Sequence, residues 1–299
     1  MAKYEKVGLI GLGVMGFGMA VNLLKAGYTV VACDINQERI KMLPEQSKVI
    51  AVSKPCEVTE HTNVVITMLP NSPHVQSVIY DENGLLSGKT EGLFLIDMSS
   101  ISPDVTREIG KDLKAKGIKF VEGPVSGGQS GANNGTLTIM CAGDDKDIDD
   151  AMEIFEAVGK NIVRCGECGA GQVVKVANQL MSAINLISMS EAFALAVKAG
   201  VNPEIVMKVI QGGSGKCWAV DNRMPEILKG NFEPGFTIDL HTKDVKLAVE
   251  MAKNMNLPLY ATNLVAELFK TAQVKGLGKK DNCAVIKLYE ELAGVEVRS

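Results

Sequence analysis

The sequence has few aromatic residues and no excess of basic charge. Aromatic residues make up 5% of the 299 residues, and 31 Lys and Arg stand against 35 Asp and Glu, which gives a formal net charge of -4. Nucleic-acid-binding domains usually carry a basic surface, often with aromatic side chains on which bases stack. We therefore expect small-molecule partners and no nucleic acid.

Histidine and cysteine are too sparse for a metal centre or a disulfide framework. The histidines are His61, His74 and His241, and the seven cysteines are an odd number scattered along the chain. Scattered thiols are typical of a reducing compartment. Cys165 and Cys168 form a C-x-x-C motif, but no second pair or nearby histidine completes a zinc site. We expect no bound metal.

The chain lacks an apolar segment with the character of a signal peptide or a membrane span. Its first residues pass from a charged stub directly into an apolar strand. Residues 176–190 carry no charge, but Asn, Gln and Ser interrupt them too often for a membrane span. The sequence thus indicates a cytoplasmic protein with no membrane partner.

The first half of the chain contains short apolar runs, and each run is bounded by Gly, Pro, Asn or Asp. They are residues 7–13, 29–34, 64–70, 93–100, 118–125 and 137–143. Near-continuous apolar runs indicate strands buried on both faces, and the amphipathic segments between them supply the crossover helices of a parallel sheet. The predicted fold is a doubly wound α/β sheet of the Rossmann type.

After residue 163 the pattern predicts only helices. A long helix is expected near 171–199, because this stretch has no proline and no interior glycine. Shorter helices are expected at 203–211, 219–229, 241–254, 260–275 and 281–294. Since one hydrophobic core rarely grows much beyond about 250 residues, we predict two domains. Residues 1–164 bind a dinucleotide, and residues 165–299 form an all-helical substrate and oligomerisation domain.

A glycine-rich motif follows the first predicted strand and begins a helix. It reads Gly11-Leu12-Gly13-Val14-Met15-Gly16. In this context the glycines permit a tight turn and close approach of the backbone to a pyrophosphate, while free N–H groups at the helix start face the phosphates. The motif predicts dinucleotide binding.

Asp34 ends the second predicted strand, 18 residues after Gly16. A carboxylate there accepts hydrogen bonds from the adenosine ribose and repels a 2′-phosphate. The next three residues include no arginine, which favours NAD over NADP. NADP remains possible, because Arg39 is close enough to reach a phosphate.

Lys175 is the only charged residue between Glu167 and Glu191. A lysine buried in an apolar helix gives up its proton more readily than a solvated one, which suits proton transfer. Asn178 and Gln179 lie three and four residues on and share its helix face. The alternative is a lysine that extends to solvent and has no role in chemistry.

Ser126, Gly127 and Gly128 follow the strand predicted to end at Val125. Consecutive glycines expose backbone N–H groups that, with a serine hydroxyl, can bind a carboxylate or a developing oxyanion. A plain turn is the alternative. Lys243 begins a helical pattern in the second half and could reach a bound anion, although an isolated lysine is usually a surface charge.

Four separated motifs resemble those of the β-hydroxyacid dehydrogenases, the group that contains 3-hydroxyisobutyrate dehydrogenase and tartronate semialdehyde reductase. They are GLGVMG, with Met19 and Asn22 behind it, then EGPVSGGQSGANNGTLT at 122–138, GAGQVVKVANQ at 169–179, and DLHTKD at 239–244. The resemblance spans nearly the whole chain.

The resemblance implies a role for each matching residue. Lys175 would be the general acid and base, and Asn178 would orient substrate and lysine. Ser126, Gly127 and Gly128 would bind the substrate carboxylate, and Lys243 would contact cofactor and substrate. The implied cofactor contacts are Gly11, Leu12, Gly13, Met15, Gly16, Asp34, Leu69, Pro70, His74, Ser100 and Lys243.

The implied substrate is a small carboxylate-bearing aldehyde or hydroxy acid. The segments 68–75 and 97–100 resemble tartronate semialdehyde reductases, whereas GSGKCW at 213–218 resembles 3-hydroxyisobutyrate dehydrogenases. Gln129, Asn133 and Asn134 favour a polar pocket and hence tartronate semialdehyde, if they face the cleft. Glyoxylate and succinate semialdehyde are further candidates.

Two other readings stay open, and so does the oligomeric state. A 6-phosphogluconate dehydrogenase is disfavoured, because the chain has no evident arginine cluster for a sugar phosphate. An NAD-binding regulator that kept the fold and lost the chemistry is the non-enzyme alternative. The long apolar helix and the family resemblance together predict a homodimer or homotetramer.

Overall fold

The computed structural model describes residues 3–299 and divides into two compact units. The first unit ends at Lys175 and the second is Val176–Ser299. The division falls inside the long helix α8 (Ala170–Lys198), later in the chain than the domain boundary expected after residue 164. The first turns of α8 therefore belong with the sheet.

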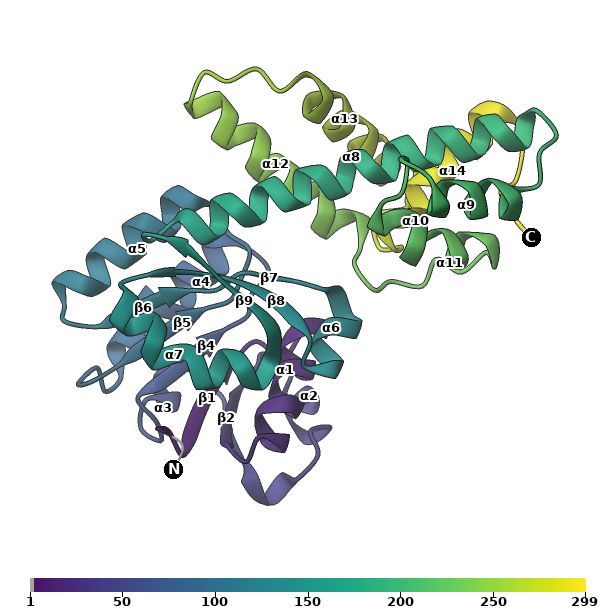
Figure 1. Cartoon of the computed structure of the whole chain (residues 1–299). Helices are drawn as coiled ribbons and strands as arrows, with labels where there is room; N and C mark the ends of the chain where they lie inside the picture. The colour runs from purple at the N-terminus through teal and green to yellow at the C-terminus, as the bar shows by residue number, and fades with distance from the viewer. Residues whose placement is uncertain (1–2) are drawn as a thin grey trace. The chain divides into compact units, whose positions relative to one another are not determined.

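The first unit is built on a mostly parallel sheet, as predicted (Figure 1). Within residues 3–299 its nine strands are β1 (Lys6–Ile10), β2 (Thr29–Cys33), β3 (Val49–Val52), β4 (Val64–Thr67), β5 (Phe94–Asp97), β6 (Lys119–Glu122), β7 (Val125–Ser126), β8 (Leu137–Gly143) and β9 (Gly159–Gly166). Their order is β3-β2-β1-β4-β5-β6-β8-β7, with β9 paired to β8. The order reverses between β1 and β4, and nucleotides bind at the carboxyl ends of strands at such a point.

The sheet changes direction at β8. This strand runs antiparallel to β6 and β7, whereas β9 runs parallel to it. The sequence pattern predicted the region of β8 but not β3 or β9. The missed β3 is a four-residue apolar strand (VIAV) at one end of the sheet order in which only Val52 is buried, and β9 is largely exposed, so neither is a long buried apolar run.

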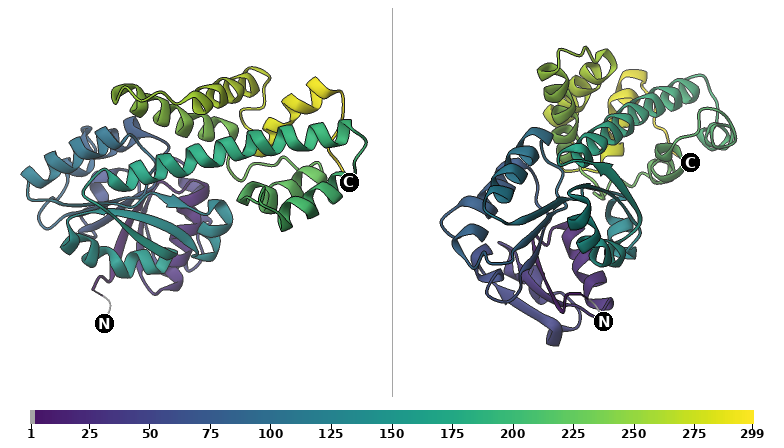
Figure 2. Two further views of the ribbon diagram at one scale, coloured as in Figure 1. Left: turned by 45° about the horizontal axis from the view of Figure 1, so that its top comes forward. Right: turned by 60° about the vertical axis from the view of Figure 1, so that its left-hand side comes forward.

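Both faces of the sheet are covered by helices (Figure 2). The helices of this unit are α1 (Val14–Lys25), α2 (Gln37–Lys41), α3 (Pro55–Val58), α4 (Ser72–Tyr80), α5 (Pro103–Ala115), α6 (Gly128–Asn134) and α7 (Asp145–Val158). Val7 and Leu9 of β1 belong to one core, with residues of α1 and α7. Ile10 belongs to the other core, with residues of α4 and α5. Burial on both faces explains why the strands lack polar alternation.

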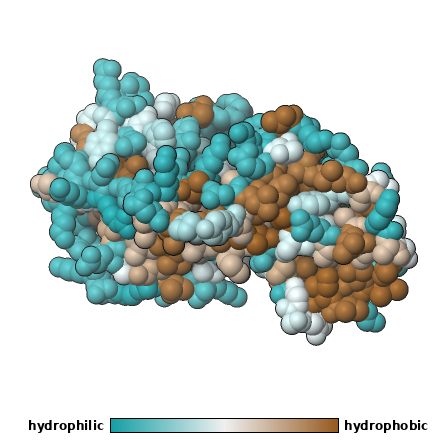
Figure 3. Space-filling view, turned by 90° about the horizontal axis from the view of Figure 1, so that it is seen from above, coloured by the Kyte–Doolittle hydropathy of each residue, from teal (hydrophilic) through white to brown (hydrophobic). Residues whose placement is uncertain are grey.

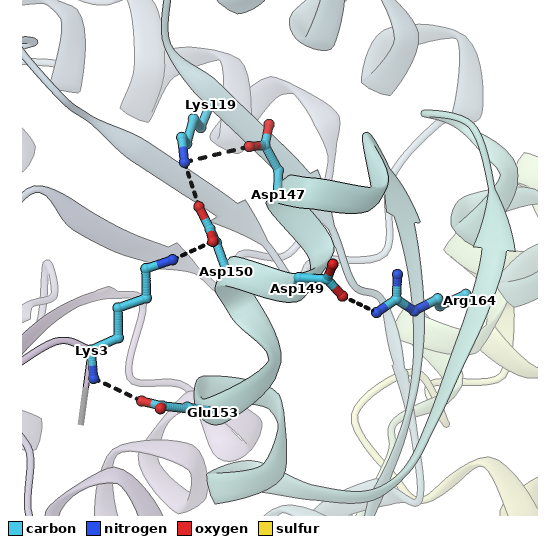
Figure 4. A network of polar contacts seen from close by, with 7 residues as sticks. All are labelled: Lys3, Lys119, Asp147, Asp149, Asp150, Glu153 and Arg164. Atoms are coloured by element: carbon cyan, nitrogen blue, oxygen red, sulfur yellow. Dashed lines mark hydrogen bonds and ion pairs between the residues drawn. The ribbon is translucent and has the colours of Figure 1, made fainter. Parts of the chain in front are cut away.

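A network of hydrogen bonds and ion pairs connects Lys3, at the beginning of the described chain, to α7 (Figure 4). Its members are Lys3, Lys119, Asp147, Asp149, Asp150, Glu153 and Arg164. The Asp150 carboxylate forms ion pairs with both Lys3 and Lys119, so it connects the first described residue to β6. Exposed pairs contribute about 0 to 1 kcal/mol each, and no member of the network is among the residues expected to carry chemistry.

The second unit is all helical, as predicted. It contains most of α8, then α9 (Pro203–Gly212), α10 (Trp218–Asn222), α11 (Met224–Leu228), α12 (Ile238–Asn254), α13 (Tyr260–Val274), the 3-10 turn η3 (Asn282–Val285) and α14 (Ile286–Ala293). The single helix expected at 219–229 is divided into α10 and α11, because Pro225 lies in the first turn of α11. Phe193, Met224 and Phe269 are fully buried in its core.

Helix α8 is, among residues 3–299, the one helix long and apolar enough to cross a membrane by length and composition. Within its most apolar stretch 39% of the residues are buried. Core helices of soluble proteins have the same length and composition, so these two properties alone do not indicate a membrane span.

Candidate active site

The glycine-rich loop lies between β1 and α1, as the sequence predicts. Gly11 has φ of +95°, which glycine adopts without strain. A Cβ on Gly16 would overlap the carbonyl oxygen of Gly11, whereas a Cβ on Gly13 would meet nothing within 4 Å. The first and third glycines are thus needed for packing, and the second leaves open space at the N-terminus of α1. A pyrophosphate fits such a loop.

Asp34 lies at the carboxyl end of β2, beside this loop. Its carboxylate accepts hydrogen bonds from the backbone N–H of Leu12 at 2.5 Å and of Asn36 at 2.7 Å. Arg39 donates to the carbonyl oxygens of Leu12 at 2.9 Å and Gly13 at 3.3 Å. The structure therefore brings the carboxylate and the arginine to the same loop, where both can affect the choice between NAD and NADP.

The loops after β4 and β5 are joined by hydrogen bonds. The backbone N–H of Leu69 donates to the Ser99 hydroxyl at 2.9 Å, and the Thr67 hydroxyl donates to Asp97 at 2.8 Å. Ser100 follows Ser99, and Pro70 is exposed after Leu69. The parallel strands β1, β4 and β5 are adjacent, so these loops lie on the edge of the sheet that carries the glycine loop.

His74 lies in the first turn of α4, at the same edge of the sheet. Its side chain is exposed, and its Nδ1 contacts the side-chain oxygen of Asn71. The position is compatible with the cofactor contact expected from the resemblance. Its role stays a prediction.

Ser126, Gly127 and Gly128 connect β7 to α6. Gly127 and Gly128 have φ of +132° and +62°, so two successive residues adopt conformations that favour glycine. Such a turn directs neighbouring N–H groups to one side and can bind an anion. A Cβ on Gly128 would meet nothing within 4 Å, which leaves its backbone accessible.

The residues proposed to make the neighbouring pocket polar differ in their surroundings. Gln129 is exposed in the first turn of α6. Asn133 has its side-chain oxygen against Gly18 of α1, and Asn134 donates to Ser130 within α6 at 3.3 Å. The side chains of Asn133 and Asn134 thus contact α1 and α6, whereas that of Gln129 is exposed.

Lys175 is the last residue of the first unit and is 7% exposed. It lies in the second turn of α8, whose first turn packs closely on the sheet. A Cβ on Gly171 would overlap the carbonyl oxygen of Met140 in β8, and β8 pairs with β7, which ends at Ser126. The lysine and the Ser-Gly-Gly turn are thus attached to the same strand.

Glu122 and Gln172 fix the start of α8 to the ends of β5 and β6. The fully buried Glu122 carboxylate accepts from the N–H groups of Gly169 at 2.6 Å, Gly171 at 3.0 Å and Gln172 at 3.2 Å. The Gln172 amide donates to the Ser99 carbonyl at 2.8 Å and accepts from the Ile101 N–H at 3.1 Å. Ser100 therefore lies between the two backbone groups that Gln172 holds.

Two opposing effects determine the pKa of the Glu122 carboxyl. The pKa of its carboxyl is raised to about 7, because the rise caused by burial exceeds the lowering by the hydrogen bonds from Gly171, Gly169 and Gln172. The N–H groups at a helix start favour a carboxylate over a neutral acid. They offset part of the cost of burying the charge.

The second unit carries Asn178 and Lys243. Asn178, exposed on α8, donates to the side chain of Gln179 at 3.1 Å. Gln179 donates to Asp244 of α12 at 2.5 Å, and Lys243 pairs with the other oxygen of Asp244 at 2.8 Å. This chain of contacts connects Lys243 to α8 one residue after Asn178.

His241 lies within the core of the second unit. Its side chain is fully buried, its Nε2 lies 3.3 Å from the Gln179 carbonyl oxygen, and its Nδ1 lies 3.1 Å from the Asn282 amide nitrogen. Its ring packs against Phe236 and Phe269. These contacts connect α12 to α8 and to η3.

Sequence reasoning missed Glu122, Gln172 and Asp244. Glu122 binds backbone groups 47 to 50 residues later, and Asp244 binds a glutamine 65 residues earlier, so no local pattern marks either contact. All three stand inside the quoted motifs, which is the one signal that could have drawn attention to them. No group of three or more His, Cys, Asp or Glu in residues 3–299 is arranged to hold a metal.

Models of two known families match the chain over most of its length. Residues 6–166 match the NAD binding domain of 6-phosphogluconate dehydrogenase, and residues 169–289 match a domain described as the NAD-binding domain of NADP-dependent 3-hydroxyisobutyrate dehydrogenase. The chain belongs to the β-hydroxyacid dehydrogenase family. As a member of this family, it is an NAD(P)-dependent oxidoreductase that acts on hydroxyl groups.

Relatives of known activity match over nearly the whole chain. The chain is 38% identical to 2-(hydroxymethyl)glutarate dehydrogenase of Eubacterium barkeri over 99% of both chains. It is 37% identical to 2-hydroxy-3-oxopropionate reductase of Escherichia coli K12, over 96% of this chain and 98% of the relative. The solved structure of Mycobacterium tuberculosis 3-hydroxyisobutyrate dehydrogenase with L-serine has a TM-score of 0.84 and 30% identity, over 95% of this chain and 98% of that one.

Proposed function

We propose that this dehydrogenase interconverts a small 3-hydroxy acid and its semialdehyde, with tartronate semialdehyde (2-hydroxy-3-oxopropionate) as the favoured substrate. The observation that carries the proposal is the burial of Lys175 on a helix start fixed to the sheet that also carries the Ser-Gly-Gly turn. A buried lysine and a glycine turn able to bind an anion, both attached to the same strand, suit the reduction of an aldehyde that bears a carboxylate.

In the proposed chemistry a nicotinamide cofactor, when bound, supplies or accepts the hydride. Lys175 Nζ donates a proton to the carbonyl oxygen as the aldehyde is reduced, and takes the hydroxyl proton in the reverse direction. Ser126, Gly127 and Gly128 hold the substrate carboxylate. Asn178 orients the substrate and the lysine, and Lys243 contacts the bound anions from the second unit.

The same proposal includes a preference for NAD over NADP. The glycine loop and the residues after β4 and β5 would hold the cofactor, with Leu12, Met15, Leu69, Pro70, His74 and Ser100 among its contacts. Asp34 would accept hydrogen bonds from the ribose, and its negative charge would repel a 2′-phosphate. Arg39 provides an opposing charge at the same loop, so the preference is for NAD without exclusion of NADP.

The choice of substrate rests on chemistry that the relatives' names share. Glycerate, 3-hydroxyisobutyrate and 2-(hydroxymethyl)glutarate each have a CH2OH group on the carbon next to a carboxylate, and differ in the other group on that carbon, C2. The Escherichia coli relative and the exposed Gln129 after the Ser-Gly-Gly turn favour the hydroxyl group of tartronate semialdehyde at C2. The Mycobacterium tuberculosis relative and the segment 213–218 favour the methyl group of 3-hydroxyisobutyrate as the second candidate.

A substrate panel tests the proposal. Oxidation of NADH and of NADPH is followed with tartronate semialdehyde, methylmalonate semialdehyde, succinate semialdehyde and glyoxylate. We expect the highest kcat/KM with tartronate semialdehyde and NADH. A higher value with methylmalonate semialdehyde would establish the second candidate. Binding of NADH without turnover of any aldehyde would indicate the regulator instead.

A further inference from the structure

Glu122 is a buried carboxylate that the proposed chemistry does not use. It lies at the end of β6, four residues before Ser126, and its side chain is fully buried. Both oxygens are engaged: one accepts from the N–H groups of Gly169 and Gly171, and the other from that of Gln172. All three donors belong to the residues that lead into or begin α8.

The contact is close, because the chain has glycine where a side chain would separate the helix from the strand. A Cβ on Gly171 would lie 3.2 Å from the Glu122 carboxyl carbon and would overlap the Met140 carbonyl oxygen. Gln172 adds two hydrogen bonds, to Ser99 and Ile101, on either side of Ser100. The start of α8 is therefore held by five hydrogen bonds to the ends of β5 and β6.

Lys175 follows Gln172 by three residues on the same helix. Any shift of the first turn of α8 would carry the lysine with it, since an α-helix is rigid over one turn. Proton transfer requires the donor within about 3 Å of the reacting oxygen, and a displacement of about 1 Å can reduce the rate about 100-fold.

We propose that Glu122 is a positioning residue for the reaction, which fixes the start of α8 on β6 and thereby sets the place of Lys175. The inference rests on the proposed function, in which Lys175 transfers the proton. Glu122 itself does not touch the substrate or the cofactor. Its effect passes through the helix.

The test compares Glu122→Gln with Glu290→Gln in the full chain, with the best aldehyde of the panel. Glu290 of the second unit is the control, because it is also a buried carboxylate, 7% exposed, that accepts from a backbone N–H, that of Val297 at 2.9 Å, although it also pairs with Arg298 at 2.6 Å. We expect Glu122→Gln to lower kcat about 10- to 100-fold. The Kd for NADH should change less than about threefold, since the glycine loop belongs to β1 and α1. Glu290→Gln should leave both near the wild-type values.

A double-variant cycle separates positioning from a general loss of structure. In a Lys175→Ala background, Glu122→Gln should cause almost no further loss of kcat, because the group that it positions is gone. An equal loss with and without Lys175 would overturn the inference. So would a kcat of Glu122→Gln within about twofold of Glu290→Gln.

If Glu122→Gln does not fold, Glu122→Asp is compared with Glu290→Asp. Aspartate keeps the charge but is shorter by one carbon–carbon bond, about 1.5 Å, so kcat should still fall at least about fivefold relative to the control. Equal kcat values would overturn the inference. The single variant Lys175→Ala tests the proposed function by itself. If Lys175→Ala keeps its kcat, Lys175 is not the proton donor. If Lys175→Ala loses its kcat but Glu122→Gln does not, only the positioning role is contradicted.

Discussion

The two units of the chain bury their apolar residues to different extents. In the first unit most strands are covered on both faces, and residues such as Val7, Leu9 and Ile66 are fully buried. In the second unit many large apolar side chains are exposed, as the hydrophobic areas in Figure 3 show. They are Met181, Leu195, Val201, Ile205, Val209, Trp218, Leu240, Met255, Leu257, Tyr260, Leu264, Val274 and Leu292.

The difference indicates different tasks. The first unit completes its own core and holds the glycine loop, the Ser-Gly-Gly turn and Lys175 on elements joined to one sheet. The second unit carries Asn178 and Lys243 and exposes apolar surface of a kind that proteins usually cover with a partner. We therefore expect substitutions in the first unit to change chemistry, and substitutions on the apolar surface of the second to change assembly.

The strongest test of this comparison is Lys175→Ala. Without the proposed proton donor, kcat should fall about 1000-fold or more, while the Kd for NADH stays nearly unchanged. Steady-state kinetics and a fluorescence titration with NADH measure the two quantities. Lys198→Ala, at the exposed end of the same helix, is the control and should behave as wild type. A loss smaller than tenfold would rule out Lys175 as the donor.

A smaller effect is expected from Lys243→Ala in the second unit. Loss of the one charge that we propose to contact bound anions should lower kcat/KM about 10- to 100-fold, mostly through KM. Lys246→Ala, an exposed lysine one turn along α12, should have no effect. If Lys243→Ala reduced kcat as severely as Lys175→Ala, the chemistry would not belong mainly to the first unit.

Asp34→Ser tests the cofactor preference of the first unit. Removal of the carboxylate at the glycine loop should raise the ratio of kcat/KM with NADPH to kcat/KM with NADH about 10-fold, because the repulsion of a 2′-phosphate is lost. Glu38→Ser removes an exposed carboxylate of α2 and is the matched control. An unchanged ratio in Asp34→Ser would contradict the assignment.

The smallest effect on turnover per active site is expected from Leu195→Glu. Leu195 is 73% exposed on α8, and a charge there should weaken the association of copies of the chain. Light scattering after size exclusion should show a dimer or tetramer for the wild type and a smaller species for the variant. Lys208→Glu, at an exposed polar position of α9, should keep the wild-type mass. A monomeric wild type would contradict the expectation of an oligomer.

Local patterns in the sequence predict most of the fold and part of the site. The glycine loop is predictable because its turn, its strand and its helix are adjacent in the chain. The sequence does not predict β3, which is a short strand at one end of the sheet order, or β9, whose side chains are mostly exposed. The break between α10 and α11 follows from Pro225, which the helical periodicity alone does not register.

The parts of the site that the sequence does not predict depend on contacts between distant segments of the chain. Lys175 is recognisable in the sequence as a lone charge. Glu122, which anchors its helix, is not recognisable, because it binds backbone N–H groups, which nearly every residue has. Asp244 is similar, because its partner Gln179 lies on another helix. Only the folded chain shows which carboxylate meets which helix.

The unbroken path of α8 also restricts how this chain can change in length. Lys175 and Asn178 stand on one continuous helix, so their angular relation depends on the number of residues between them. Deleting or inserting a single residue there would turn Asn178 by about 100° around the helix axis and shift it by about 1.5 Å. Surface loops absorb such length changes easily, whereas these few positions should accept substitutions but neither gaps nor additions.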